Sequence, residues 1–203
     1  MKLNPITAED ITVLAPVGSY LALRVGFAFP MTEVNNLPPD WVDHYTRQRY
    51  MLQDPVMRWI YANTGAIRWS AIDLDDPYRI LAQARTFGLA YGLAVSVFDG
   101  NSEGQRSFGT FVRSDREFDD GEISMLSSYV SRRHDQKAPP TNLTAAELEA
   151  LRMVKEGMRA KQIAFRLGVT EGAVKQRLTN AKKKLGASTG TQAATMATEF
   201  GLI

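Results

Sequence analysis

The sequence contains no cysteine and only two histidines, His44 and His134, in 203 residues. The absence of cysteine excludes disulfide bonds, cysteine-containing zinc sites and thiol nucleophiles. The two histidines stand far apart in the chain and lack the spacing of metal ligands. We therefore expect no metal and no other cofactor, and a reducing compartment suits such a chain.

Long apolar runs are also missing. The segment from Met1 to Asp10 has neither the basic start nor the apolar core of a signal peptide. No stretch approaches the ~18 consecutive apolar residues that a transmembrane helix needs. We expect a cytoplasmic protein with no membrane partner, and its length allows one large or two small domains.

The charge is unevenly distributed along the chain. Between Leu143 and Ile203, ten Lys and Arg face five Glu, which gives +5 and leaves −3 for the rest of a chain whose net charge is +2. A basic end on a mildly acidic body indicates that this end meets a polyanion. The signal is weak by itself, since inert surfaces carry similar excesses.

A polar segment from His134 to Asn142 separates two parts of different character. It contains the consecutive prolines Pro139 and Pro140 and shows no apolar period. Proline removes a backbone donor and disfavours helix in the residue before it. We predict a first domain over residues 1–133, a linker over 134–142 and a second domain over 143–203.

The first part mixes helical and strand patterns. Helices are expected over 40–58, 77–87 and 119–133. Strands over 94–98 and 107–112, joined by a turn-rich loop at 99–104, are expected to form a hairpin. Helices around an antiparallel sheet predict the α+β class, as an α-β-α sandwich.

The second part is predicted to be an all-α domain of four helices. Thr144 and Glu147 form a capping box before the first helix, which Gly157 ends. A second helix covers 161–167, and a turn at Gly168 leads to a third helix, capped by Thr170 and ending near Leu185. The fourth helix covers about 191–200.

Two short helices joined at Gly168 are typical of a helix-turn-helix, with Ala164 as the small residue at their contact. The third helix places an apolar stripe inward, at Val174, Leu178, Ala181 and Leu185. Its opposite face carries Glu171, Lys175, Gln176, Thr179 and Lys182, which can reach base edges in a major groove. The lysines at 182–184 can neutralise phosphates. Periodicity alone fits a plain helical bundle with a basic face equally well.

Many spaced positions across 143–203 resemble the LuxR-type DNA-binding domain. The matching residues are Leu143, Thr144, Glu147, Leu151, Gly157, Gln162, Ile163, Ala164, Leu167, Val169, Thr170, Val174, Lys175, Lys184, Leu185, Gly186, Ala193, Ala197 and Gly201–Ile203. The resemblance implies double-stranded DNA as partner and puts Lys175 and Thr179 at positions that often approach bases. With the polar face and the basic end of the third helix, the candidate DNA-binding residues are Lys175, Gln176, Thr179, Lys182 and Lys183. The resemblance also implies a dimer contact on the fourth helix, where Ala193, Ala194 and Ala197 allow close approach. Ala173 and Arg177 depart from the family's usual Thr and His.

The first part lacks the pattern of a receiver domain but carries another. Trp41, Tyr45, Asp54-Pro55 and Trp69, followed by Gly88 and Gly92, resemble the autoinducer-binding domain of quorum-sensing LuxR regulators over about residues 20–130. Such domains bind N-acyl homoserine lactones. Structural roles remain open, because Trp and Tyr at helical spacing usually belong to a core and Asp-Pro often marks a boundary.

The residue types suit that ligand. An indole N–H can donate to the lactone carbonyl, a carboxylate can accept from the amide N–H, and a phenol can serve the acyl carbonyl. The resemblance assigns these roles to Trp41, Asp54 and Tyr45 in turn, makes Trp69 a wall, and adds a hydrogen bond from Ser107. Leu37 stands where the family often has Tyr, which leaves the acyl length open.

We therefore predict a ligand-responsive homodimeric transcription regulator that binds a pseudo-palindromic DNA site and senses an N-acyl homoserine lactone. The alternatives are a ligand-independent family member and an antagonist that heterodimerises with a related regulator. A lactone hydrolase is not expected, since no Ser–His–Asp arrangement or Gly-x-Ser-x-Gly elbow is evident in the sequence.

Overall fold

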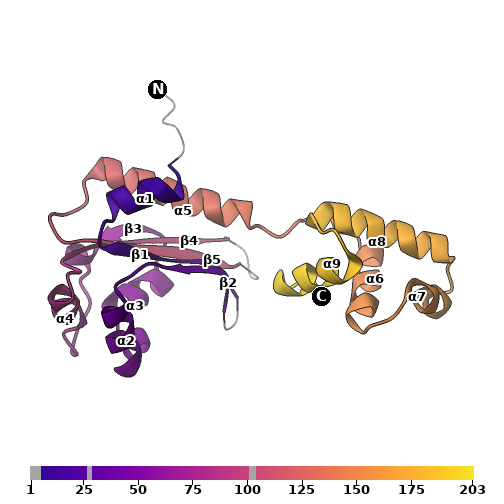
Figure 1. Cartoon of the computed structure of the whole chain (residues 1–203), viewed down its shortest axis with the longest axis horizontal. Coiled ribbons are helices and arrows are strands. Elements are labelled where there is room, and N and C mark those ends of the chain that lie inside the picture. The colour runs from indigo at the N-terminus through magenta and orange to yellow at the C-terminus, as the bar shows by residue number, and fades with distance from the viewer. Residues whose placement is uncertain (1–5, 27–28, 101–103) are drawn as a thin grey trace. The chain divides into compact units, whose positions relative to one another are not determined.

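The computed structural model describes residues 6–26, 29–100 and 104–203. The chain divides into two compact units, Met1–Ala138 and Pro139–Ile203, coloured indigo to rose and orange to yellow in Figure 1. Residues 1–5 of the N-terminal segment and residues 101–103 of the predicted loop lie outside the described residues.

The first unit is built on a five-stranded antiparallel sheet with the order β2-β1-β5-β4-β3. The strands are β1 (Gly18–Val25), β2 (Pro30–Asn35), β3 (Gly65–Arg68), β4 (Tyr91–Phe98) and β5 (Arg106–Arg113). The predicted hairpin is confirmed as β4 and β5, which pair from Tyr91 opposite Arg113 to Phe98 opposite Arg106. The other three strands were not predicted, because β2 is an exposed edge strand and β3 has only four residues.

Helices cover both faces of this sheet (Figure 1). The helices of the first unit are α1 (Ala8–Leu14), α2 (Pro39–Arg47), α3 (Pro55–Ala62), α4 (Ile80–Thr86) and α5 (Asp120–Gln136), with 3-10 turns η1 (Tyr50–Leu52) and η2 (Trp69–Ala71). Helices α1 and α5 lie on one face, and α2 and α3 lie on the other. The predicted α-β-α sandwich of the α+β class is confirmed.

The single helix predicted over 40–58 is wrong. The chain leaves α2 at Gln48, takes a left-handed conformation at Arg49 (φ 56°) and restarts as α3 at Pro55. Proline has no N–H and disfavours helical conformation in the preceding residue, so Asp54 is extended and caps α3 instead.

The predicted start of the linker at His134 also needs correction, because α5 continues to Gln136 and His134 is buried. Its Nδ1 lies 2.7 Å from Ser107 Oγ on β5, and its Nε2 lies 2.8 Å from Asp99 Oδ1. The buried Arg24 donates from Nε to the His134 carbonyl at 2.9 Å and also forms an ion pair with Asp99. These polar contacts fasten the last turn of α5 to the sheet.

The second unit consists of α6 (Ala145–Lys155), α7 (Ala160–Leu167), α8 (Glu171–Leu185) and α9 (Gly190–Glu199). The capping box is confirmed: the Thr144 side chain accepts from the Glu147 N–H, and the Glu147 carboxylate accepts from the Thr144 N–H at 2.8 Å. The predicted four-helix domain is therefore present, with boundaries within a residue or two of those expected.

The alanines of α9 do not lie where the sequence placed them. Ala193, Ala194 and Ala197 are almost completely buried in the core of the second unit, which they share with Leu151 and Leu185. Their small size lets α9 approach α6 within one chain. The predicted dimer contact through these three side chains is therefore wrong, because they already face the core of their own unit.

The structure contains no helix, among the residues it describes, that is long and apolar enough to cross a membrane. The same residues include no group of three or more His, Asp or Glu side chains placed to hold a metal ion.

Candidate functional site

A cavity of about 450 Å³ lies in the first unit, between the sheet and helices α2 and α3. Its volume falls in the usual range for small-molecule sites, ~300–1,000 Å³. The lining residues are Tyr20, Ala22, Val25, Phe29, Pro30, Glu33, Asn35, Leu37, Trp41, Val42, Tyr45, Thr46, Met51, Asp54, Val56, Met57, Tyr61, Trp69, Phe108 and Thr110. Four of the five predicted ligand residues, Trp41, Tyr45, Asp54 and Trp69, are among them. We call this the sensing cavity.

Asp54 is the buried carboxylate of the sensing cavity, with 7% of its surface exposed. As the N-cap of α3, its Oδ1 accepts from the Val56 N–H at 2.8 Å, and its Oδ2 accepts from the Tyr45 hydroxyl at 2.8 Å. Burial raises the pKa of Asp54, while the hydrogen bonds from Tyr45 and the backbone act in the opposite direction. Each carboxylate oxygen can accept more than one hydrogen bond, so Asp54 can take another donor.

Trp41 and Tyr45 are four residues apart on α2, so they share one face of the helix. Their rings contact edge to face, with centroids 5.5 Å apart. Trp41 is buried, and it lines the sensing cavity. Burial, followed by the nearby Asp54 charge, raises the pKa of Tyr45 well above its ordinary value, so its hydroxyl stays protonated.

Trp69 lies directly on the sheet because Gly92 leaves room for it. A Cβ atom at Gly92 would stand 2.0 Å from Cδ2 of the Trp69 ring, well inside contact distance. The close approach makes the indole a wall of the sensing cavity. Its Nε1 is buried and has no hydrogen-bond partner in the described part of the chain.

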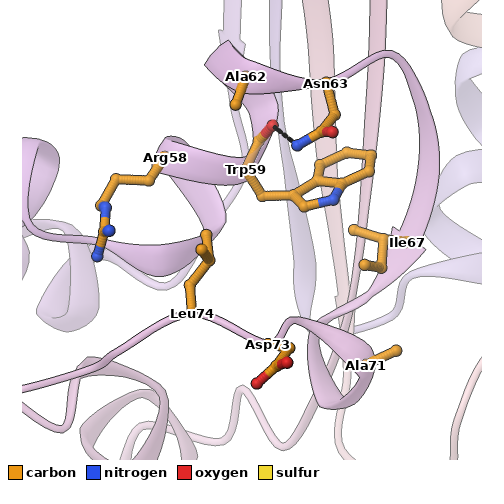
Figure 2. Close-up of a pocket in the computed structure, with 8 residues that line it drawn as sticks. All are labelled: Arg58, Trp59, Ala62, Asn63, Ile67, Ala71, Asp73 and Leu74. Carbon is orange, nitrogen blue, oxygen red and sulfur yellow. Dashed lines mark hydrogen bonds between the residues drawn. The ribbon is translucent and has the colours of Figure 1, made fainter.

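A second hollow, of about 420 Å³, lies between α3 and η2 and is shown in Figure 2. The Trp59 indole lies beside Ile67, and the Asn63 side-chain amide donates to the Trp59 carbonyl at 3.0 Å. Arg58 extends away from the indole and donates to the Asp75 carbonyl at 3.2 Å. The residues that line this second hollow differ from those of the sensing cavity, so Trp59 does not line the sensing cavity.

Ser107 does not belong to the sensing cavity. Side chains alternate along a strand, and Phe108 and Thr110 of β5 point into the cavity, so Ser107 points to the α5 face. Its hydroxyl contacts His134, as described above, and accepts from the Arg24 N–H at 2.9 Å. The predicted ligand contact of Ser107 is therefore wrong, because its side chain lies on the other face of the sheet. The β5 hydroxyl that lines the cavity is that of Thr110, three residues farther along the strand, which the sequence analysis did not single out.

The contact of Ser107 with His134 and of His134 with Asp99 brings a Ser–His–Asp trio together, which the sequence did not reveal. Ser107 is completely buried, and it does not line the sensing cavity. Because substrate cannot reach the hydroxyl, this trio is a packing network and not a nucleophilic centre.

The helix-turn-helix of the second unit is formed by α7 and α8. Gly168 takes a left-handed conformation (φ 64°) at the turn, and the Val169 N–H donates to the Ala164 carbonyl at 3.0 Å. The Thr170 side chain caps α8 by accepting from the Ala173 N–H at 3.1 Å. Val174 is completely buried, so the opposite face of α8 is turned outward.

That outward face holds the predicted DNA-binding residues. Lys175, Gln176, Thr179 and Lys183 are exposed, and Lys182 is half-buried. Lys175 Nζ lies 2.8 Å from Glu171 Oε1, and Gln176 donates to Asn180 Oδ1 at 2.9 Å. Both contacts are exposed and can be exchanged for contacts to another partner.

Lys184, by contrast, points inward. Its Nζ lies 2.8 Å from Glu147 Oε2 and donates to the Asn142 carbonyl at 2.8 Å. Glu147 is almost completely buried, so this lysine holds α8 to the start of α6. The run of three lysines had suggested that Lys184 could neutralise phosphate, but its side chain is not available for that role.

Two family models match adjacent parts of the chain. The autoinducer binding domain matches residues 25–136, and the model of bacterial regulatory proteins of the luxR family matches residues 141–197. The chain belongs to the LuxR family of autoinducer-binding transcription regulators.

Relatives of this LuxR-family regulator align with most of its length. The transcriptional activator protein VanR of Vibrio anguillarum is 30% identical over 83% of this chain and 76% of the relative. The transcriptional activator protein AnoR of Acinetobacter nosocomialis is 30% identical over 84% and 77%. A solved structure of SdiA in complex with octanoyl-rac-glycerol is 25% identical, covers 98% of this chain and 91% of that chain, and has a TM-score of 0.50. The family consists of transcription regulators, so this LuxR-family chain is not an enzyme.

Proposed function

We propose that this LuxR-family regulator is a homodimer whose DNA binding responds to an N-acyl homoserine lactone in the sensing cavity. The observation that carries the proposal is the buried carboxylate of Asp54, held by the Tyr45 hydroxyl and the Val56 N–H, in a mainly apolar cavity that the Trp41 indole also lines. An acceptor and a donor at this position match the amide N–H and a carbonyl of the ligand head group.

In this arrangement Asp54 accepts the ligand amide N–H, and Trp41 donates to the lactone carbonyl. Tyr45 has a single hydroxyl proton, which it donates to Asp54. We therefore assign Tyr45 to positioning Asp54, rather than to the acyl carbonyl. Thr110 lines the cavity and is the hydroxyl we assign to that carbonyl.

Ligand binding is expected to act on the folded state. A ligand that binds only the folded protein stabilises it by mass action, and it favours whichever domain arrangement binds it better. On the DNA side, Lys175, Gln176 and Thr179 are assigned to base edges, and Lys182 and Lys183 to phosphates. A dimer would present two α8 helices about one DNA turn apart, so the operator should be pseudo-palindromic.

The ligand assignment is tested by calorimetric titration of the full chain with N-octanoyl homoserine lactone. Its octanoyl chain is chosen because SdiA has been solved with an octanoyl compound. Asp54→Asn keeps a good N-cap residue for α3 but removes the charge, and we expect it to lower affinity about 10- to 100-fold. Asp43→Asn, on the exposed part of α2, is the matched control and should leave affinity unchanged. Equal affinity of both variants would contradict the assignment.

The DNA assignment is tested by a mobility-shift series at several salt concentrations. Lys175→Ala should weaken binding by about 1–3 kcal/mol and relax preference at one operator position. Lys155→Ala, an exposed lysine on α6, is the control. Binding by Lys175→Ala that equals that of the control at every salt concentration would remove Lys175 from the interface.

A further inference from the structure

The outward face of α8 carries two amide side chains that contact each other. Gln176 Nε2 donates to Asn180 Oδ1 at 2.9 Å, and both residues are exposed. Residues four apart on a helix are neighbours on one face, and helical side chains lean toward the N-terminus, so the Asn180 side chain leans over Gln176. The contact restricts the rotation of the Gln176 amide within the protein itself.

Gln176 points directly away from the core of the second unit. Val174 is completely buried and marks the inward direction of α8. At ~100° per residue, Gln176 lies about 200° around the helix from Val174, whereas Lys175 lies only about 100° from it. Residues near the start of a recognition helix are the ones that meet base edges, so Gln176 is placed to contact the floor of a groove.

One turn before Gln176, the same outward line of α8 carries a glycine. A Cβ at Gly172 would meet only Thr170 Oγ among the described residues, at 3.9 Å, which is an ordinary contact, and the φ of Gly172 is not positive. Neither packing nor backbone conformation therefore requires glycine, which is a poor helix former. Its lack of a side chain leaves the space beside Gln176 open to an approaching base pair.

The chemistry of the Gln176 amide decides which base it suits. Nε2 has two hydrogens, and one of them goes to Asn180. The other hydrogen and Oε1 provide one donor beside one acceptor. In the major groove, adenine is the base that presents the complementary pair, the N7 acceptor beside the N6 donor, and a glutamine amide can bind both at once. Gln176 can therefore keep its contact with Asn180 while it contacts an adenine.

We propose that Gln176 recognises an adenine in each half of the operator, through N6 and N7, and that Asn180 positions the Gln176 amide for this contact. A glutamine side chain loses rotamer entropy when it is fixed, and a contact that fixes it beforehand lowers that cost on binding. This inference rests on the DNA side of the proposed function, to which it adds the identity of one base pair in each half-site.

The test begins with in vitro selection of duplexes from a random pool by the full chain, with and without N-octanoyl homoserine lactone. The best duplex is then compared by mobility shift with variants in which one base pair is changed in both half-sites. The wild type is expected to prefer A·T about tenfold at one position, the value of a bidentate contact. Gln176→Ala should abolish this preference, and Asn180→Ala should reduce it about threefold and leave the other positions unchanged.

Two further variants complete the comparison. Gln176→Glu should move the preference at the same position from A·T to C·G, because a carboxylate accepts from cytosine N4 and has no donor for adenine N7. Gln136→Ala is the control, since it removes an exposed amide of α5 in the first unit, and it should keep every wild-type preference.

Three outcomes overturn the inference in distinguishable ways. If no A·T preference of the wild type is lost in Gln176→Ala, the base assignment is wrong and the proposed function stands. If Asn180→Ala keeps the full preference, or changes the preference at a different position, Asn180 does not position Gln176. If the wild type enriches no sequence, with or without the lactone, the DNA side of the proposed function is wrong, and the base assignment with it.

Discussion

The contact between Gly92 and Trp69 allows a sharp test of how the cavity wall is built. Gly92→Ala would place a Cβ atom 2.0 Å from Trp69 Cδ2 and 2.2 Å from Cε2. Carbon atoms in contact lie ~3.5–4.0 Å apart, so the indole must move by about 1.5 Å or more. Gly92 does not have a positive φ, and the clash rather than backbone strain therefore decides the outcome.

The magnitude follows from two opposing effects. Overpacking of a fitted contact costs ~1–3 kcal/mol. Alanine restricts the unfolded chain and returns ~0.4–1 kcal/mol where the native backbone accepts it. We expect Gly92→Ala to lower the free energy of unfolding by about 1–2 kcal/mol. In a Trp69→Ala background the obstacle is absent, and the same substitution should instead raise the free energy of unfolding by about 0.4–1 kcal/mol.

The assay is urea unfolding followed by far-ultraviolet circular dichroism, because tryptophan fluorescence changes with the substitution itself. Gly26→Ala is the control, since a Cβ there meets only the Phe29 carbonyl at 3.8 Å. If Gly92→Ala destabilises both backgrounds by the same amount, the clash with Trp69 is not its cause and the reasoning is refuted.

Three further predictions concern the polar networks, each checked by urea unfolding. His134→Ala empties a buried site and removes the contacts of His134 with Ser107 and Asp99, which each keep a contact to Arg24, and should cost about 2–4 kcal/mol. A loss below roughly 0.5 kcal/mol, which is about the error of such data, would contradict this. The pKa of Glu122 is held at about 2, chiefly by hydrogen bonds from Arg116. The stabilisation that ionised Glu122 gives to the folded state is complete at pH values above 4.5, the ordinary pKa of the group, and is lost as pH falls toward 2. Glu122→Gln should therefore flatten the decrease in the free energy of unfolding over that pH range. Lys184→Ala should destabilise the second unit by about 1–2 kcal/mol, whereas the exposed neighbour Lys183→Ala should not.

The second unit could be predicted almost completely from the sequence. Its signals are local: the capping box at Thr144, the turn glycine at Gly168 and the apolar stripe of α8 that includes Val174 each act within one helix or turn. The position of the fourth helix was predicted equally well, but the partners that its alanines contact were not. Ala193 is small enough for either a dimer contact or a tight core, and only packing against α6 decided for the core.

The first unit was predicted less completely, because its sheet depends on pairing between distant segments. The β1 strand joins β5 in the middle of the sheet, and no local pattern marks that pairing. The same holds for the network of Arg24, Asp99, Ser107 and His134, whose members are scattered along the chain.

By itself, then, the sequence determined the helical unit, the hairpin and the identity of Trp41, Tyr45, Asp54 and Trp69 as a group, because spacing along a helix and residue chemistry are local properties. The tertiary structure alone decided which hydroxyl faces the cavity, Thr110 instead of Ser107, and that Tyr45 donates to Asp54. Side chains alternate faces along a strand, and only the assembled sheet, with its helices in place, decides which face is which.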